Sequence, residues 1–367
     1  MSPLTMHTDI AIIGGGLSGL ATADLLLRAG YDWQLLEARD RLGGRILSLP
    51  AREGASKSER YDLGPAWIWP HNPRALALTN KLGLEVFPQH AEGRLVFQDG
   101  SGYVRRDMNF STMAGSLRIG GGMHALTQGL VDRLLANRLS IEAPVIRISE
   151  DRAGLRVTGP NVELSARMVV LALPPRIAAQ ISFAPNLPEA AVLALSAIPT
   201  WMAGQAKAVA VYSSPFWRGQ GLSGDGISQR GPMVEIHDAS PSTGGEGALF
   251  GFIGVSPDIR QADNTGLRTA ILHQFGEMFG PEAENPDALL LQDWAAEAAT
   301  CTKADFAPLR EHPAYDLPPA LKGLMGGRLV FAGSETAREQ GGFLEGALVA
   351  AEAAVAQVTK TGMPVPS

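Results

Sequence analysis

One region near the N-terminus constrains the fold more than any other part of the chain. Residues 9–13 (DIAII) have strand character and lead directly into the glycine-rich turn GGGLSG at residues 14–19. Residues 20–30 have helical spacing of apolar residues and end at a glycine, and residues 33–37 (WQLLE) form a second strand that ends in an acid. This order is typical of a βαβ unit that binds a dinucleotide.

The residue types in this unit each have a physical task. Gly14 allows the tight turn, Gly16 lets the backbone approach a pyrophosphate, and Gly19 lets the helix pack closely on the strand. The start of the helix offers free N–H groups and a positive dipole end to phosphate oxygens. Glu37 is placed to accept hydrogen bonds from ribose hydroxyls. The predicted cofactor-binding residues here are Gly14, Gly16, Leu17, Ser18, Gly19 and Glu37.

A second glycine pair follows the ribose-binding acid. Residues 38–45 read ARDRLGGR, and such a loop can wrap around the phosphates of the cofactor. A simple surface turn with solvated arginines is the alternative. We favour the cofactor interpretation because of the pattern at the C-terminal end of the chain. It adds Ala38, Arg39, Gly43, Gly44 and Arg45 to the predicted binding residues.

The last fifty residues hold the second informative pattern. A strand at residues 329–332 (LVFA) runs into a glycine and an acid, and an alanine-rich helix is predicted over residues 343–358. Glycines at the start of this helix let a flat group approach the backbone, and the positive helix end suits the negative charge of a reduced flavin. Glu335 is alternatively a loop or capping acid. This region adds Gly333, Ser334, Glu335, Gly342, Phe343 and Leu344 to the predicted set.

Composition argues against several classes of protein. The net charge of −6 comes from 31 basic and 37 acidic residues without a basic cluster, so neither nucleic acid nor a membrane is an expected partner. The single cysteine, Cys301, and the scattered histidines give no metal-ligand spacing, so no metal is expected. No apolar run suits a membrane-spanning helix and no signal peptide is evident, so we expect a cytoplasmic monomer or homodimer.

Seven stretches together resemble the flavin-containing amine oxidase family, which includes monoamine and polyamine oxidases. In chain order they are DIAIIGGGLSGLATADLLLRAG, LLEARDRLGGRI, YDLGPAWIW, LRIGGGMHALTQGL, VVLALPP, KAVAVYSSPFW and GRLVFAGSETAREQGGFLEGAL. The resemblance implies an α/β fold in which a Rossmann-type FAD-binding domain carries an inserted α+β substrate domain. It places the FAD-binding domain at residues 1–72, 117–195 and 303–367, and the substrate domain at residues 73–116 and 196–302.

The resemblance also implies further cofactor contacts along the flavin and at the adenine. These residues are Gly64, Pro65, Ala66, Trp67 and, in a strand whose backbone meets the adenine, Val145. The glycine run at residues 120–122 begins no second βαβ unit, so no NADPH domain is visible. Electrons must then enter the flavin from the substrate itself, which favours an oxidase or dehydrogenase over an NADPH-dependent monooxygenase.

Lys207 is the predicted catalytic residue. Lys207, Val209 and Val211 share one face of a predicted strand. From the residues alone, Lys207 could lie at the solvent-exposed end of that strand. The resemblance implies instead that its amine holds a water near flavin N5. The implied reaction is hydride transfer from an amine to the flavin, hydrolysis of the resulting imine to an aldehyde or ketone, and transfer of the electrons to oxygen or another acceptor.

The substrate side departs from the pattern of monoamine oxidases, in which two aromatic rings flank the amine. Phe343 matches one ring, but residues 295–305 contain no second ring. The candidates to replace it are Trp67, Trp69, Trp201 and Trp294. The predicted substrate-binding residues are Phe343, Trp69 and Trp201.

Cofactor attachment and substrate class follow from two further departures. Cys301 lies two places early relative to the cysteine that holds the flavin covalently in some relatives, so noncovalent FAD is predicted. The strand beside the flavin has no arginine for a substrate carboxylate, which favours an amine over an amino acid, with Arg74 and Arg118 as alternatives. Two other functions stay open: FAD-dependent C–C desaturation, as in protoporphyrinogen-oxidase-like enzymes, and a non-catalytic FAD-binding partner protein.

Overall fold

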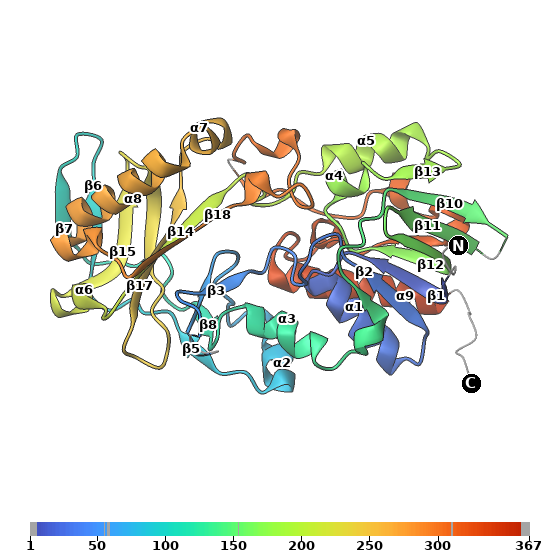
Figure 1. Ribbon diagram of the computed structural model, residues 1–367, viewed down its shortest axis with the longest axis horizontal. Helices are drawn as coiled ribbons and strands as arrows, with labels where there is room; N and C mark the ends of the chain where they lie inside the picture. The colour runs from blue at the N-terminus through green and yellow to red at the C-terminus, as the bar shows by residue number, and fades with distance from the viewer. Residues whose placement is uncertain (1–5, 55, 57–58, 153, 310, 361–367) are drawn as a thin grey trace.

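Two β-sheets occupy opposite ends of the molecule (Figure 1). The computed structural model describes residues 6–54, 56, 59–152, 154–309 and 311–360, and every predicted site residue lies within these ranges. One sheet has eight strands and the other has seven. The site described below is lined by residues from both sheets and from the segments between them.

Parallel pairing around the N-terminal strand organises the eight-stranded sheet. β1 (Met6–Ile13) lies between β12 (Val162–Leu171) and β2 (Trp33–Leu36) and is parallel to both. These strands are apolar because both faces of the sheet are covered, as parallel sheets require. The other strands are β9 (Leu139–Ser140), β10 (Arg147–Asp151), β11 (Gly154–Gly159), β13 (Ser182–Ala184) and β19 (Leu329–Phe331).

Helices cover both faces of this sheet. Alternate residues of β1 face different cores: Ile10 and Ile12 pack with α1, α3 and α9, whereas Ala11 and Ile13 share a core with α4 and α5. α1 packs directly on α9, the C-terminal helix, and α2 also contacts α9. The bounds are α1 (Leu17–Arg28), α2 (Pro73–Leu82), α3 (His124–Val131), α4 (Pro175–Ala178), α5 (Glu189–Ala197) and α9 (Leu344–Lys360).

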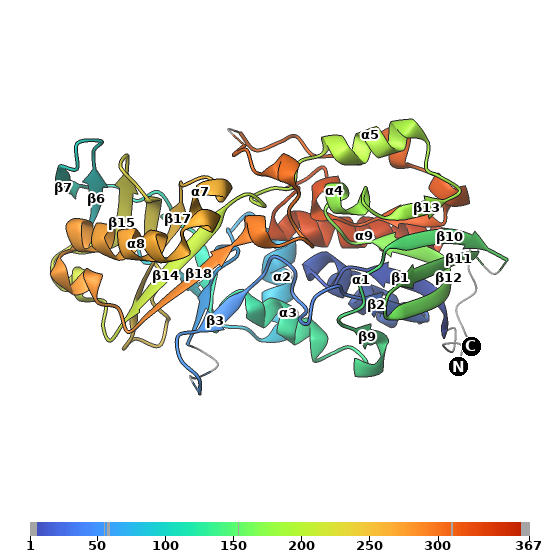
Figure 2. The ribbon, with the colours of Figure 1, turned by 45° about the horizontal axis from the view of Figure 1, so that its top comes forward.

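The second sheet is mostly antiparallel, with the strand order β18-β14-β17-β16-β15-β6-β7. One face packs on α8 (Figure 2), while Val209 and Val211 on the opposite face of β14 pack against Tyr61 and Leu63. The strands are β6 (Arg94–Gln98), β7 (Val104–Met108), β14 (Ala206–Tyr212), β15 (Leu222–Ser228), β16 (Met233–Asp238), β17 (Gly247–Ile253) and β18 (Ala288–Asp293). The helices here are α6 (Phe216–Gly219), α7 (Pro257–Ala262) and α8 (Asn264–Phe279).

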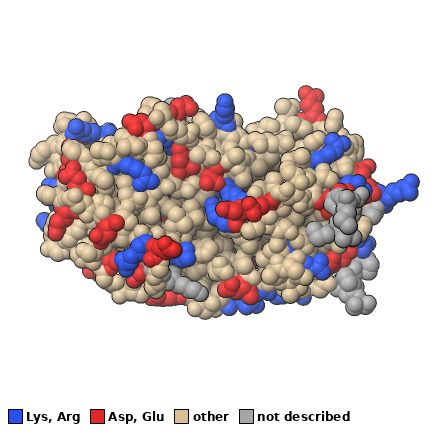
Figure 3. Space-filling view, viewed as in Figure 1, with Lys and Arg blue, Asp and Glu red and all other residues tan. Residues whose placement is uncertain are grey.

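Two short strand pairs lie between the sheets. They are β3 (Ser48–Pro50) with β4 (Arg60–Asp62), and β5 (Val86–Pro88) with β8 (Leu117–Ile119). Within the described ranges, no helix is long and apolar enough to cross a membrane. On the face seen in Figure 3, acidic and basic side chains are interspersed and large areas carry neither charge.

The α/β architecture agrees with the sequence-based expectation. All strands of the first sheet come from the segments predicted to bind FAD, and all strands of the second sheet come from the remaining segments. α2 begins at the predicted boundary at residue 73, yet it packs on α9 and α3. The domain boundaries themselves stay a prediction.

The close contact between the start of α1 and the end of β1 leads to a testable prediction. A Cβ at Gly19 would lie 1.9 Å from the carbonyl oxygen of Gly14, so Gly19→Ala must push the helix away from the strand. We expect a loss of about 1–3 kcal/mol in the free energy of unfolding, measured by urea denaturation, and reduced FAD retention. Gly100→Ala is the control, because a Cβ there meets no atom within 4 Å. Equal stability of the two variants would contradict the prediction.

Candidate active site

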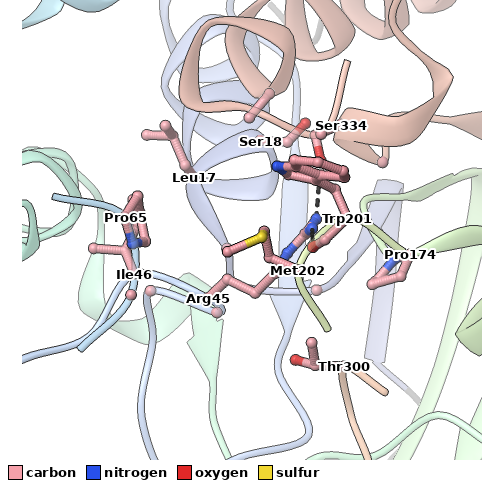
Figure 4. A pocket seen from close by; sticks show the side chains of 18 of the residues that line it. Leu17, Ser18, Arg45, Ile46, Pro65, Pro174, Trp201, Met202, Thr300 and Ser334 are labelled. Carbon is pink, nitrogen blue, oxygen red and sulfur yellow. Dashed lines mark hydrogen bonds between the residues drawn. The ribbon is translucent and has the colours of Figure 1, made fainter. Parts of the chain in front are cut away.

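A cavity of about 940 Å³ lies between the two halves of the molecule. All of the predicted site residues line it except Gly19 and Glu335. Figure 4 shows part of the lining, with Leu17 and Ser18 at the start of α1 and Trp201 and Met202 from the segment before β14. Lys207, which is far from the glycine-rich turn in the sequence, lines the same cavity as that turn.

The two glycine pairs form a backbone cradle at one end of the cavity. The N–H of Gly43 donates to the carbonyl of Gly15 at 2.8 Å. A Cβ at Gly44 would lie 3.0 Å from the Cα of Gly16, so the two loops approach as closely as glycine backbones allow. α1 begins here at Leu17, and its free N–H groups suit an anion. The cradle therefore fits the pyrophosphate of a dinucleotide.

Glu37 follows β2 directly and is buried at the edge of the cavity. Its Oε2 accepts from the N–H of Gly15 at 2.7 Å, and its Oε1 accepts from the N–H of Arg39 at 2.9 Å. These bonds fix the carboxylate, and each oxygen keeps a lone pair for a ribose hydroxyl. Val145 also lines the cavity, but it lies in the connection before β10 rather than in a strand, which corrects the sequence-based expectation.

Arg45 ties the second glycine loop to the C-terminal region. It donates to Ser334 Oγ at 2.9 Å, as Figure 4 shows, and to both oxygens of Glu335 at 2.6 and 3.1 Å. Glu335 is fully buried behind Arg45 and does not reach the cavity. Its carboxylate therefore positions the guanidinium, which itself lines the cavity.

Arg39 makes a second long-range connection. Its Nε donates to Glu297 at 2.9 Å and its Nη2 donates to Thr300 Oγ1 at 2.6 Å. Thr300 lines the cavity, whereas the neighbouring Cys301 does not. The Cys301 thiol donates to the carbonyl of Thr302, and burial raises its pKa to about 12. Such a thiol is a poor nucleophile.

Tryptophan and phenylalanine rings from several parts of the chain line the cavity. They are Trp67, Trp69, Trp201, Phe252, Trp294 and Phe343. Phe343 stacks on His312 with ring centroids 4.6 Å apart and an interplanar angle of 9°. His312 thus covers one face of Phe343, and the Trp201 ring also packs against Phe343, with ring centroids 5.9 Å apart. Phe306, the first ring after residues 295–305, packs with Cys301 instead.

Lys207 is enclosed rather than solvated, with only 2% of its surface exposed. Its Nζ donates to the carbonyl of Gly64 at 3.1 Å and lies 3.7 Å from the ring centroid of Phe250. Burial is the main reason that the pKa of Lys207 is lowered to about 7. The charge of Asp62 raises this pKa, and the charge of Arg118 lowers it further. The alternative of a lysine at the exposed end of the strand is therefore wrong.

Several residues around the cavity escaped the sequence analysis. Met202 and Gln340 both line the cavity with left-handed backbone, at φ values of 60° and 53°. Such backbone is costly for a residue with a side chain, and it concentrates at functional sites. The sequence gives no sign of this left-handed backbone, because Met and Gln, unlike glycine, are not residues that favour it. The electrostatic effects of Asp62 and Arg118 on Lys207 were also missed, since both residues are far from Lys207 in the sequence.

The fold and the cavity define a dinucleotide-binding site, and comparisons with known proteins identify its family. The family described as flavin containing amine oxidoreductase matches residues 17–110 and 103–359. A putative flavin-containing monoamine oxidase, AofH, of Mycobacterium tuberculosis is 27% identical, over 95% of this chain and 96% of the relative. The alignment spans 459 positions, more than this chain has residues, so the relative carries segments that this chain lacks.

Two solved structures share the fold. Putrescine oxidase bound to putrescine matches with a TM-score of 0.80 and 22% identity, over 97% of this chain and all of the other. Cyclohexylamine oxidase from Brevibacterium oxydans matches with a TM-score of 0.79, 22% identity and the same coverage.

The chain therefore belongs to the flavin-containing amine oxidoreductase family. It is an FAD-dependent enzyme that oxidises amines, and the predicted family, fold class and cofactor are confirmed. The roles predicted for individual site residues stay predictions.

The lowered pKa of the enclosed Lys207 leads to a prediction of how the free energy of unfolding depends on pH. A lysine whose folded pKa is about 7 binds fewer protons when folded than when unfolded between pH 7 and its ordinary pKa near 10.4. Its destabilising effect is therefore largest at pH 7 and below, and it falls as pH rises through this window. Lys207→Met should be more stable than the native protein by a few kcal/mol at pH 7, because each pKa unit is worth about 1.4 kcal/mol.

Urea denaturation of FAD-saturated protein at several pH values measures this difference. The advantage of Lys207→Met should shrink between pH 7 and pH 10. Lys322→Met, which changes an exposed lysine, is the control. Its free energy of unfolding, relative to the native protein, should not depend on pH. An advantage of Lys207→Met that stays constant or grows with pH would show that Lys207 is charged in the folded protein.

Proposed function

We propose that this enzyme oxidises an apolar primary monoamine with noncovalently bound FAD, giving an aldehyde or ketone and ammonia. One observation about the cavity lining carries the proposal. The substrate part of the cavity is lined by aromatic rings and Lys207. Each arginine and glutamate among the described residues that line the cavity already forms hydrogen bonds with other protein groups. Aromatic and apolar walls favour apolar substrates. A charged group on the substrate, other than the reacting amine, would be left without a partner.

The arginines argue against an amino acid as substrate. Arg39 is bound to Glu297 and Thr300, and Arg45 is bound to Glu335. Arg74 and Arg118, the alternatives considered from sequence, do not line the cavity, and Arg118 donates to two backbone carbonyls. A substrate carboxylate would therefore be buried without a guanidinium, which is costly.

The acids argue against a diamine. The lining glutamates are Glu37, which accepts from two backbone N–H groups, and Glu345, which accepts from the N–H groups of Arg74 and Ala75. The second ammonium of a diamine would find no free carboxylate among them. Putrescine oxidase shares the fold, but the cavity of this chain favours a substrate with one amine.

The residues of the cavity have three tasks in this reaction. The bound flavin supplies the hydride acceptor, which no protein side chain can replace. The rings of Trp201 and Phe343 orient the apolar part of the substrate and exclude water from it. Lys207, with one hydrogen bond to the backbone and a pKa near neutrality, is placed to hold or release a proton in the cavity. Oxygen is the proposed final acceptor; the cytoplasmic location and the monomeric or homodimeric state stay predictions.

Anaerobic titration of the FAD-loaded enzyme with four amines tests the substrate class. Cyclohexylamine and benzylamine should bleach the visible flavin absorbance. Putrescine should be at least ~10-fold less effective, because its second ammonium would be buried without a partner. L-leucine should behave like putrescine, since its carboxylate lacks a partner.

The outcomes separate the proposals. Equal bleaching by putrescine and cyclohexylamine would contradict the monoamine assignment. FAD that remains bound and is bleached by none of these compounds would favour C–C desaturation or a non-catalytic role.

Cys301 provides a test of cofactor attachment. Its buried thiol has a raised pKa and does not line the cavity, so we expect no covalent bond to the flavin. Acid precipitation should release all of the yellow colour into the supernatant. Cys301→Ala should bind FAD in the same ratio as the native protein. Flavin that stays in the pellet of the native protein but not of Cys301→Ala would contradict the prediction.

A further inference from the structure

The indole of Trp67 is held by a glutamine that does not itself reach the cavity. Trp67 lines the cavity, and its Nε1 donates to Gln89 Oε1 at 2.9 Å. Gln89 is only 5% exposed, and it does not line the cavity. The hydrogen bond therefore connects the cavity wall to a buried side chain outside it.

Backbone pairing explains why this glutamine lies beside the tryptophan. Ile68 and Leu117 exchange two backbone hydrogen bonds, at 2.9 and 2.8 Å. Leu117 of β8 is also the register partner of Pro88 of β5, and the N–H of Gln89 donates to the carbonyl of Ser116 at 2.9 Å. β8 thus lies between the segment that carries the tryptophan and the segment that carries the glutamine, and the two side chains meet although 22 positions separate them.

The amide of Gln89 can face only one way. Its Nε2 donates to the carbonyl of Asp238 at 2.8 Å and to the carbonyl of His90 at 3.2 Å. The amide nitrogen only donates, and so does an indole N–H. If the amide turned over, its oxygen would face two carbonyl oxygens and its NH₂ group would face the indole N–H. The network therefore fixes Oε1 toward Trp67.

The main carbonyl that receives Gln89 belongs to a firmly held residue. Asp238 is fully buried at the end of β16. Its Oδ2 accepts from Trp217 Nε1 at 3.0 Å and from Arg218 Nε at 2.9 Å. The glutamine therefore links Trp67 to the second sheet rather than to an exposed surface group.

Two rings of the same sheet pack against the indole. His237 of β16 meets Trp67 at an interplanar angle of 87°, with ring centroids 5.0 Å apart, and Phe250 of β17 lies 5.2 Å from Trp67. His237 and Phe250 are register partners, and their centroids are 5.3 Å apart. Lys207 Nζ lies 3.7 Å from the centroid of the same Phe250 ring. The wall formed by Trp67 is thus continuous with the surroundings of Lys207.

His237 is fixed at both ring nitrogens. Its Nδ1 lies 2.9 Å from Asp225 Oδ1, and its Nε2 lies 2.9 Å from Glu235 Oε1. Ionised carboxylates only accept hydrogen bonds, so beside two of them both ring nitrogens donate and the ring is an imidazolium. Burial alone would lower the pKa of His237, but the bonds to the two acids outweigh burial and raise this pKa. The indole therefore packs against a ring that cannot turn freely.

We infer that Gln89 is a positioning residue that acts through Trp67: with the rings of His237 and Phe250, it holds the indole in one orientation along the cavity wall beside Lys207 before a substrate binds. The inference rests on the proposed function, because this wall would orient the amine. A turned indole loses its acceptor, and the loss of such a bond disfavours the turned ring by about 5-fold or more. Without Gln89, part of the population would have to reorder before a substrate could bind.

Fluorine NMR tests the orientation of the indole without any turnover. The chain has six tryptophans, so labelling with 5-fluorotryptophan gives few signals, and Trp67→Phe identifies the signal of Trp67. In the FAD-loaded native protein without substrate, Trp67 should give one sharp signal. Gln89→Met should broaden, split or shift this signal, because a thioether is only a weak acceptor for the indole and donates to neither carbonyl.

Gln274→Met is the matched control. Gln274 of α8 is a buried glutamine, 2% exposed, that bonds to the N–H and the carbonyl of Met233. α8 packs on the opposite face of the second sheet from Trp67, and Gln274 does not line the cavity. Its substitution removes a buried amide of the same kind, so it should lower stability but leave the Trp67 signal and the KM for an amine unchanged.

Steady-state oxidation of cyclohexylamine tests the role of Gln89 in the reaction. Gln89→Met should raise KM by about 5-fold, because substrate must then bind the fraction with an ordered indole, and it should change kcat much less. Trp67→Phe lacks the N–H that Gln89 holds, so adding Gln89→Met to it should raise KM no further. A further rise of similar size would show that Gln89 acts by another route, and it would overturn the inference.

The NMR and kinetic measurements separate failure of the inference from failure of the proposed function. If none of the tested amines reduces the flavin, the proposed function fails, and the NMR signal still decides whether Gln89 positions the indole. A Trp67 signal in Gln89→Met that stays as in the native protein would overturn the inference. An altered signal with a native KM would also overturn it, because Gln89 would then be only a structural residue.

Gln89→Glu replaces Gln89→Met if that variant does not fold. Glutamate keeps the length of the side chain, but its carboxyl group can donate to at most one of the two carbonyls that Gln89 binds. The side chain should then be held less firmly, and the Trp67 signal should again broaden, split or shift. An unchanged signal in this variant would overturn the inference.

Discussion

The close contact between the start of α1 and the end of β1 is the constraint on which the site depends. Gly19 lies against the Gly14 carbonyl at a distance that no side chain could tolerate, so the helix begins directly at the edge of the parallel sheet. Ser18 in the first turn donates to the carbonyl of Ala332 at the end of β19, which joins the N-terminal unit to the C-terminal region. α9 then packs along α1. The two ends of the chain thus meet at one point, and the cradle for the dinucleotide forms there.

Charged side chains hold the rest of the cavity wall in place across long sequence separations. Arg45 connects the second glycine loop to Ser334 and Glu335, and Arg39 connects the same loop to Thr300. Both guanidiniums are partly buried and make several hydrogen bonds, which is the arrangement in which arginine is most effective. Because these arginines are used for structure, they cannot neutralise a substrate carboxylate. The same bonds therefore shape the cavity and narrow the class of substrate.

The burial of Lys207 and Asp62 carries a cost that the chain has not eliminated. A buried amine without a counter-ion destabilises the fold, and a methyl-terminated side chain at position 207 would avoid that cost. The buried Oδ2 of Asp62 also has no hydrogen-bond partner among the residues that the structure describes, which is unfavourable in a low-dielectric interior. Local destabilisation of this kind is typical of functional sites, where an altered proton affinity is part of the chemistry. Its position beside the cavity, rather than within either core, supports that interpretation.

Much of the fold was predictable from local sequence because its elements have local causes. The strand, glycine turn and helix of residues 9–30 follow from periodicity and from glycines placed where the backbone must turn or approach another chain segment. The helix predicted over residues 343–358 extends from Leu344 to Lys360, close to its apolar pattern. Lys207 was also predictable, although only through resemblance to a family, since a lysine at the start of an apolar run is ambiguous by itself.

The sequence by itself determined that the chain binds a dinucleotide and where the phosphate cradle lies, because glycine spacing and helix starts act over a few residues. Tertiary structure alone decided that Glu335 lies behind Arg45, that His312 covers one face of Phe343, and that the Gly64 carbonyl and the Phe250 ring enclose Lys207. These relations join residues more than thirty positions apart, so no local pattern encodes them. Burial also decides the charge of Lys207, because proton affinity depends on the dielectric and the charges around a group rather than on its neighbours in sequence.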